Sequence, residues 1–75
     1  MNYEILENNF NVNGVLKFRL YSLEYIIIKK VNDVEVYAIL YPSDKKVFTS
    51  FYDAMYNYTV FNASLYSYMN RIKII

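Results

Sequence analysis

The feature that most limits what this chain can fold into is the absence of cysteine from all 75 residues. Neither a disulfide nor a thiolate metal site can reinforce such a chain. Because small domains bury a smaller fraction of their surface than large ones, 75 residues form only one core. We therefore predict a single domain over residues 1–75, stabilised by packing that contributes roughly 3–5 kcal/mol.

Aromatic residues supply the bulk that such a core needs. They make up 20% of the chain, ten of them are tyrosines, and 56% of all residues are hydrophobic. This composition excludes a disordered segment. The spacing along the predicted elements divides the tyrosines, with Tyr25, Tyr58 and Tyr68 expected in the core.

The same composition predicts a cytoplasmic protein that does not associate with a membrane. A cysteine-free chain suits a reducing compartment, and residues 1–7 lack the basic and apolar regions of a signal peptide. The apolar run over residues 25–28 is far shorter than the about 20 residues that cross a bilayer.

The sequence does not decide the secondary structure of the N-terminal segment. Residues 2–7 are compatible with a strand or a helix. Residues 8–14 are rich in asparagine and end in the sole glycine, Gly14. Both residue types tolerate left-handed backbone conformations, so we predict a turn there.

Three β segments follow. Residues 15–30 are rich in β-forming residues whose polarity alternates along the chain. The alternation shifts by one residue near Ser22, which predicts a bulge or break there. The pair Asn32-Asp33 predicts a tight hairpin turn, and residues 34–41 are predicted to form the return strand. Pro42 and the residues after it are predicted to end that strand, and residues 47–49 are predicted to form a third strand.

Two short helices are predicted at the C-terminal end. Ser50 stands three residues before Asp53, which resembles a capping box, and apolar residues follow at helical spacing. Ser64 is predicted to cap a second helix over residues 65–72. The expected fold class is α+β: a three-stranded antiparallel meander, four-stranded if the N-terminal segment joins it, followed by two C-terminal helices packed on one face.

Residues 48–54, Phe-Thr-Ser-Phe-Tyr-Asp-Ala, together with Asn62-Ala63-Ser64-Leu65 and the preceding hairpin, resemble small α+β proteins of low-GC Gram-positive bacteria, including mobile-element and phage accessory proteins. The resemblance covers about the C-terminal two thirds of the chain. It implies an architecture and carries no functional residue.

The composition also argues against an enzyme. Histidine is absent and glycine occurs once, so we predict no catalytic residue, no cofactor, no phosphate loop and no metal site. One alternative stays open, because Glu24 and Glu35 lie on the two arms of the predicted hairpin and a close carboxylate pair can act as an acid and base. A solvated pair beside lysines is the simpler interpretation.

The predicted binding residues lie on the outer face of the sheet: Lys17, Arg19, Tyr21, Tyr37 and Tyr41. Tyrosine and arginine are typical of protein interfaces, so the leading hypothesis is a protein-binding accessory module. Cations with aromatic rings are also typical of single-stranded nucleic-acid binding, although the net charge of +1 makes that the alternative.

Three isoleucines favour protein contact. Ile26, Ile28 and Ile39 lie opposite the expected core face, and a sheet that is apolar on both faces needs two coverings. The second covering is either the N-terminal segment or another chain, which includes a second copy in a homodimer.

Overall fold

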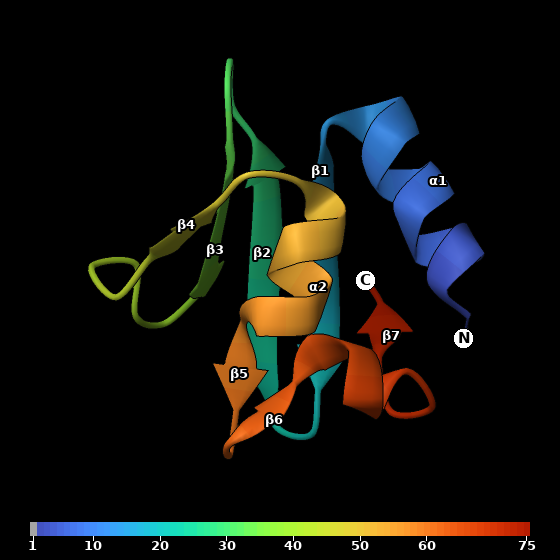
Figure 1. The fold of residues 1–75 in the computed structure, drawn as a ribbon. Coiled ribbons are helices and arrows are strands. Elements are labelled where there is room, and N and C mark those ends of the chain that lie inside the picture. Colours follow the sequence, from blue (N-terminus) through green and yellow to red (C-terminus); the bar gives the residue numbers. More distant parts are fainter. Residues whose placement is uncertain (1) are drawn as a thin grey trace.

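The computed structural model describes residues 2–75 and has two layers, a sheet and a helical layer (Figure 1). The sheet is antiparallel, with strand order β4-β3-β2-β1-β7. Its strands are β1 (Val15–Leu20), β2 (Leu23–Lys29), β3 (Val34–Ala38), β4 (Lys46–Phe48) and β7 (Lys73–Ile74). The α+β class and the antiparallel sheet are confirmed, whereas the sheet has five strands instead of three or four.

The first helix, α1 (Tyr3–Asn13), corrects the prediction of a turn over residues 8–14. The Asn2 side chain accepts a hydrogen bond from the Ile5 N–H and caps the helix, which ends at Gly14 with φ 71°. Leu6 and Phe10, one turn apart, are buried in the core. Burial of these two side chains outweighs the poor helix propensity of the asparagines between them.

The sequence predicts a bulge or break near Ser22, and the structure has a break there, at the turn that connects β1 to β2. Leu20 pairs with Leu23, so Tyr21 and Ser22 form a two-residue turn, and residues 15–30 fold into a hairpin. Tyr21 has φ 56°, an uncommon conformation for a bulky side chain. Its ring packs edge-on against Tyr68, with 6.0 Å between centroids, which helps to hold a turn that contains no glycine or asparagine.

The hairpin predicted at Asn32-Asp33 is confirmed, although its strands are shorter than expected. The Lys30 N–H donates to the Asp33 carbonyl at 2.8 Å, and residues 30–33 form the connection between β2 and β3. Strand β3 ends at Ala38 instead of Tyr41, since residues 39 and 40 turn away into the β3–β4 connection.

The helix α2 (Phe51–Asn57) begins where the sequence predicts. The Ser50 hydroxyl accepts a hydrogen bond from the Asp53 N–H at 3.0 Å. The Asp53 carboxylate accepts bonds from the Thr49 N–H at 2.9 Å and from the Asn57 side chain, and these donors lower its pKa. The predicted cap is therefore confirmed in detail.

The second predicted C-terminal helix is reduced to one turn. After a small hairpin of β5 (Thr59–Val60) and β6 (Ala63–Ser64), the 3-10 turn η1 (Leu65–Tyr68) is capped by Ser64 as expected, but it does not reach residue 72. The chain turns and adds β7 beside β1, with Ile74 opposite Phe18. Ile74 gains a ladder partner and packs against the core in this arrangement, neither of which a longer helix provides.

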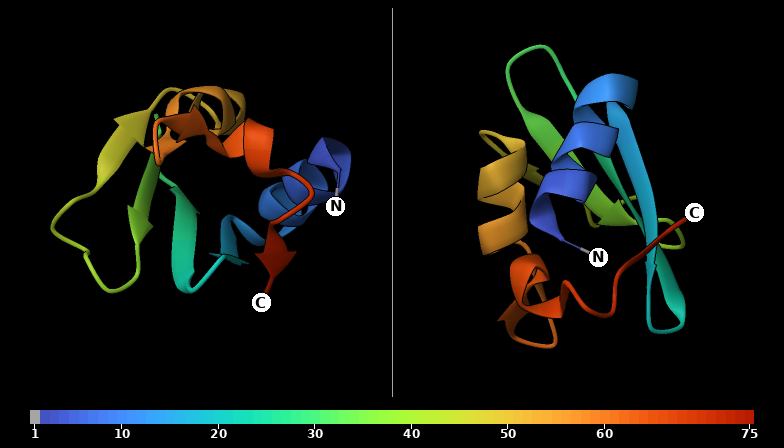
Figure 2. Two further views of the ribbon diagram at one scale, coloured as in Figure 1. Left: turned by 90° about the horizontal axis from the view of Figure 1, so that it is seen from below. Right: turned by 90° about the vertical axis from the view of Figure 1, so that its right-hand side faces the viewer.

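Both helices lie on the same face of the sheet (Figure 2). Phe10 of α1 stacks on Phe51 of α2 with 4.7 Å between ring centroids. Beneath them, Phe18 of β1 stacks on Tyr25 of β2 at 5.5 Å. The prediction of Tyr25 as a core residue is confirmed, and Tyr58 and Tyr68 are partly buried against that core. Within residues 2–75, no helix lies over the opposite face of the sheet (Figure 2).

Candidate protein-binding surface

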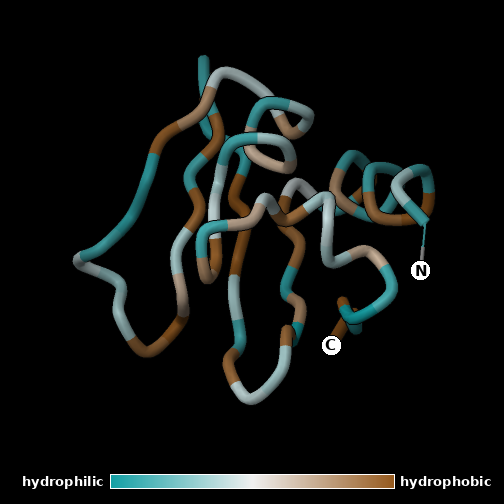
Figure 3. The backbone as a smooth tube through the Cα atoms, turned by 60° about the horizontal axis from the view of Figure 1, so that its bottom comes forward, coloured by the Kyte–Doolittle hydropathy of each residue, from teal (hydrophilic) through white to brown (hydrophobic). Residues whose placement is uncertain are grey.

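The uncovered face of the sheet, which we call the open face, consists of the strand residues that alternate with the core residues. Hydropathy alternates along β1 and β3 in the colouring of Figure 3, whereas the middle of β2 is hydrophobic on both faces. The strand register arranges the open face in rows. Its members are Val15, Lys17, Arg19, Glu24, Ile26, Ile28, Glu35, Tyr37, Val47 and Lys73, with Ile39 and Ile75 at strand ends.

The centre of the open face is apolar. Ile26 lies on the middle strand, and its partners in the register are Lys17 on one side and Tyr37 on the other. Ile28, in the next row, lies between Val15 and Glu35. Ile26, Ile28 and Tyr37 all remain partly accessible to solvent. The three isoleucines named by the sequence analysis are thus partly exposed, and no segment of residues 2–75 lies over them.

The open face brings together three of the five predicted binding residues, Lys17, Arg19 and Tyr37. Tyr21 lies in the β1–β2 turn, where it borders a small hollow together with Arg19, Arg71 and Lys73. Tyr41 lies in the β3–β4 connection, where its carbonyl accepts the Asp44 N–H. Because Tyr21 and Tyr41 lie in turns and not in strands, both are at the margin of the sheet.

The carboxylates of the open face each have a cation beside them. Glu24 accepts a hydrogen bond from Arg19 at 2.8 Å. Glu35 lies 3.7 Å from Lys45 and 3.8 Å from Lys30. The proposed carboxylate pair is not formed, because Glu35 pairs with Ile28, which is four residues from Glu24 along β2, or about 13 Å.

A second aromatic surface, absent from the sequence prediction, lies on the helical layer. Tyr3, Tyr52, Tyr56 and Tyr66 form a closed ring of neighbours from α1, α2 and η1, which we call the tyrosine cluster. The Tyr52–Tyr56 and Tyr56–Tyr66 ring centroids are each 4.4 Å apart. The spacing of Tyr52 and Tyr56 by one helical turn is a sequence signal for half of this cluster. Tyr3 lies in a segment that the sequence left open between strand and helix.

Burial and hydrogen bonding keep the tyrosine hydroxyls protonated. Burial, followed by a hydrogen bond to Glu7, raises the pKa of Tyr3 to about 12. Interaction with the Tyr66 hydroxyl raises the pKa of Tyr56 to about 12. Burial also raises the pKa values of Tyr25 and Tyr58.

These shifts predict that alkali unfolds the protein. In the unfolded chain tyrosines ionise near pH 10.0, whereas Tyr3 and Tyr56 require about 12 in the folded state. Because the folded pKa is the higher one, the stabilisation is complete below pH 10 and is lost as the pH rises towards 12. Urea midpoints measured by circular dichroism from pH 8 to 12 test this. The Tyr3→Phe variant should show a shallower fall, and a flat wild-type profile would contradict the assignment.

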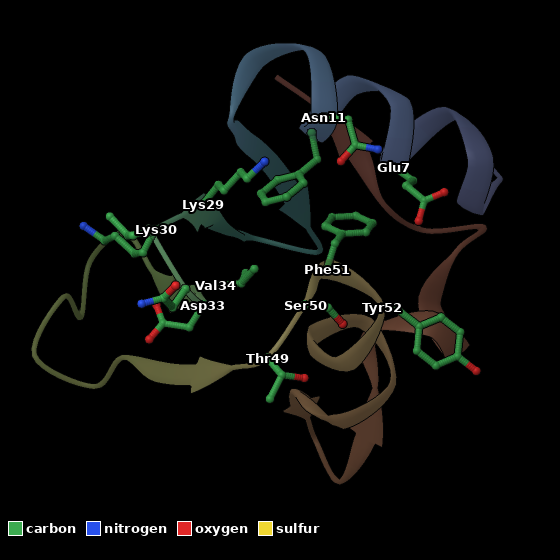
Figure 4. Close-up of a pocket in the computed structure, with 13 residues that line it drawn as sticks. Glu7, Asn11, Lys29, Lys30, Asp33, Val34, Thr49, Ser50, Phe51 and Tyr52 are labelled. Carbon is green, nitrogen blue, oxygen red and sulfur yellow. The ribbon is translucent and has the colours of Figure 1, made fainter.

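A hollow with a volume of about 530 Å³ lies between α1, the β2–β3 connection and the start of α2. In the close-up of Figure 4, Phe51 points into it, Glu7 and Asn11 come from α1, and Lys29 and Lys30 come from the far side. The Ser50 hydroxyl at its margin is already bound in the α2 cap. The hollow thus pairs an apolar floor with scattered charges.

Within residues 2–75, no group of three acidic side chains is placed to hold a metal ion, and no helix has the length and apolar character needed to span a membrane. Comparison with protein-family models, curated proteins and solved structures finds no significant match to the chain. The function is therefore inferred from the open face and its charged residues.

Proposed function

We propose that this chain is a small, non-catalytic protein-binding module that acts in the cytoplasm and binds its partner through the open face. The observation that carries the proposal is that Ile26 and Ile28 are partly exposed at the centre of a sheet whose other face is covered by both helices. Apolar side chains that stay accessible on the uncovered face of a sheet are typical of a protein-binding surface.

The residues have distinct roles in this proposal. Ile26, Ile28 and Tyr37 supply the apolar and aromatic contact area, as the central residues of protein interfaces do. Lys17 and Arg19 lie on the neighbouring strand and contribute orientation more than affinity, because exposed ion pairs contribute little. An interface of this kind predicts binding that depends weakly on salt.

Nucleic-acid binding is the second candidate, supported by one observation. Arg19 pairs with Lys73, so three cations, Lys17, Arg19 and Lys73, lie close together on β1 and β7 and share the face with the Tyr37 ring. A single strand bound there would stack a base on Tyr37 and neutralise phosphates with the cations. Its affinity would fall steeply between low and moderate salt.

Affinity capture from native lysate, run with and without nuclease, tests the two candidates. We expect the wild-type chain to retain a protein partner after nuclease and the Ile26→Lys variant to lose it, because a charge at the apolar centre must be desolvated on binding. The matched control is Tyr52→Ser, a change in the exposed tyrosine cluster on the other layer, which should retain the partner.

Three outcomes are informative. Retention of the same partner by Ile26→Lys would contradict the assignment of the open face. Loss of the partner on nuclease treatment would favour nucleic acid. Equal loss in the Tyr52→Ser control would move the binding surface to the helical layer.

A further inference from the structure

We propose that the hollow between α1, the β2–β3 connection and α2 binds a small aromatic carboxylate. The inference goes beyond the proposed function, because the hollow lies on the helical side of the sheet and shares no residue with the open face. Three properties of the hollow support it: its size, its apolar lining and the charges around it.

The size of the hollow suits one small molecule. Its volume of about 530 Å³ is within the range of roughly 300–1,000 Å³ that is typical of ligand pockets. Phe10, Phe51 and Val34 form its floor, and all three also pack into the hydrophobic core. The Phe10 and Phe51 rings stack with 4.7 Å between their centroids. The floor is therefore held in place by the core and does not have to form when a ligand binds.

Two exposed side chains at the rim add apolar contact area. Val31 in the β2–β3 connection is 96% exposed, and Tyr52 on α2 is 58% exposed. The three floor residues are buried, so a ligand meets only their outer surface and the rim supplies the remaining contact. A flat ring over the floor shields part of both rim side chains from water, which favours binding.

One cation at the hollow has no anion beside it. In Figure 4, Lys29 extends towards α1, whereas Lys30 points the other way. Lys30 lies 3.8 Å from Glu35. Within residues 2–75, no carboxylate lies within ion-pair distance of the Lys29 ammonium. Lys29 is therefore the group that an anionic ligand would bind.

The other polar groups of the hollow limit the charge of the ligand. Glu7 on α1 and Asp33 in the β2–β3 connection both line it and are both negative. They repel a doubly charged anion more strongly than a singly charged one, so a carboxylate suits this site better than a phosphate. Asn11, one turn after Glu7, can donate from its side-chain amide. The ligand carboxylate is therefore expected near Lys29 and Asn11, with its ring over the floor.

Amide NMR spectra recorded during a titration with naphthoate test the inference. Naphthoate is a flat fused-ring carboxylate, and naphthamide has the same rings without the charge. We expect saturable shifts for residues 29–34 and 49–52, with a dissociation constant on the order of 0.1–1 mM. Naphthamide should bind at least about 5-fold more weakly, because a charged hydrogen bond is lost. No saturable shift of these residues up to about 10 mM, or equal affinities for the two compounds, would overturn the inference.

The Lys29→Gln variant separates recognition of the charge from general apolar binding. It should weaken naphthoate binding about 10-fold and change naphthamide binding less than about 2-fold, because only the anion loses its partner. Lys29 is exposed at the end of β2, so we expect the fold to be kept. The matched control is Lys17→Gln, which removes the same charge from the open face and should change neither affinity. Equal losses of naphthoate binding in the two variants would contradict the role of Lys29.

The Glu7→Gln variant should have the opposite effect. It removes a negative charge from the hollow while an amide oxygen can still accept the Tyr3 hydroxyl, so naphthoate should bind about 2–3-fold more tightly. Glu4→Gln is the control, because Glu4 is exposed on the same helix and does not line the hollow. Weaker naphthoate binding by Glu7→Gln, or an equal gain in Glu4→Gln, would contradict the placement of the carboxylate in the hollow.

Discussion

Replacing Phe18 with alanine is expected to leave the chain unfolded at room temperature. Phe18 is the largest of the fully buried side chains, with an exposed fraction of 0%, and it stacks on Tyr25 at 5.5 Å. Removing a buried phenylalanine costs about 3–5 kcal/mol, which equals the roughly 3–5 kcal/mol that a core of this size supplies. A chain without disulfides has no other source of stability to offset that loss.

Urea unfolding followed by circular dichroism measures this effect. The matched control is Lys17→Ala, because Lys17 neighbours Phe18 on β1 but lies on the opposite, exposed face. We expect the control to stay within about 0.5 kcal/mol of wild type, as exposed substitutions usually do. A Phe18→Ala variant that melts like wild type would mean that the β1–β2 packing does not hold the fold.

Leu6→Ala is expected to detach helix α1 and to lower the free energy of unfolding by about 2–5 kcal/mol. Leu6 is fully buried, and with Phe10 it anchors α1 to the rest of the core. The helix has 11 residues, and helices shorter than about 12–15 residues are marginal in water without tertiary contacts. Loss of the Leu6 anchor should therefore be seen first as a loss of helix.

Amide hydrogen exchange locates the effect along the chain. Protection should fall first in α1 and later in β1 and β2, whose ladder stays paired. Ile5→Ala is the control, because Ile5 is the preceding residue and is 51% exposed. Equal effects of the Leu6 and Ile5 substitutions would contradict the docking of α1 through Leu6.

The candidate site was predictable from the sequence only in part. Lys17, Arg19 and Tyr37 could be placed on one face because strand alternation is a local property that follows from the backbone. Val47 and Lys73 could not be added, since they reach the open face through the pairing of β4 with β3 and of β7 with β1. Such pairing depends on contacts between distant residues.

Tyr21 and the tyrosine cluster show the same limit. The two-residue turn at Tyr21 lacks the glycine or asparagine that usually signals a hairpin, so the positive φ there depends on packing against Tyr68, far along the chain. Tyr3 meets Tyr52 and Tyr66 because α1 docks beside α2 and η1.

Local signals in the sequence were sufficient for the α+β class, the alternating faces of β1 to β3, and the caps at Ser50 and Ser64. Each of these depends on residues a few positions apart, whose hydrogen bonds and side-chain directions follow from backbone geometry. Folding in three dimensions settled the helical state of residues 3–13, the ending of η1 and the addition of β7. In those segments local preferences are weak, so the burial of Leu6, Phe10 and Ile74 against a core made by distant residues determines the structure.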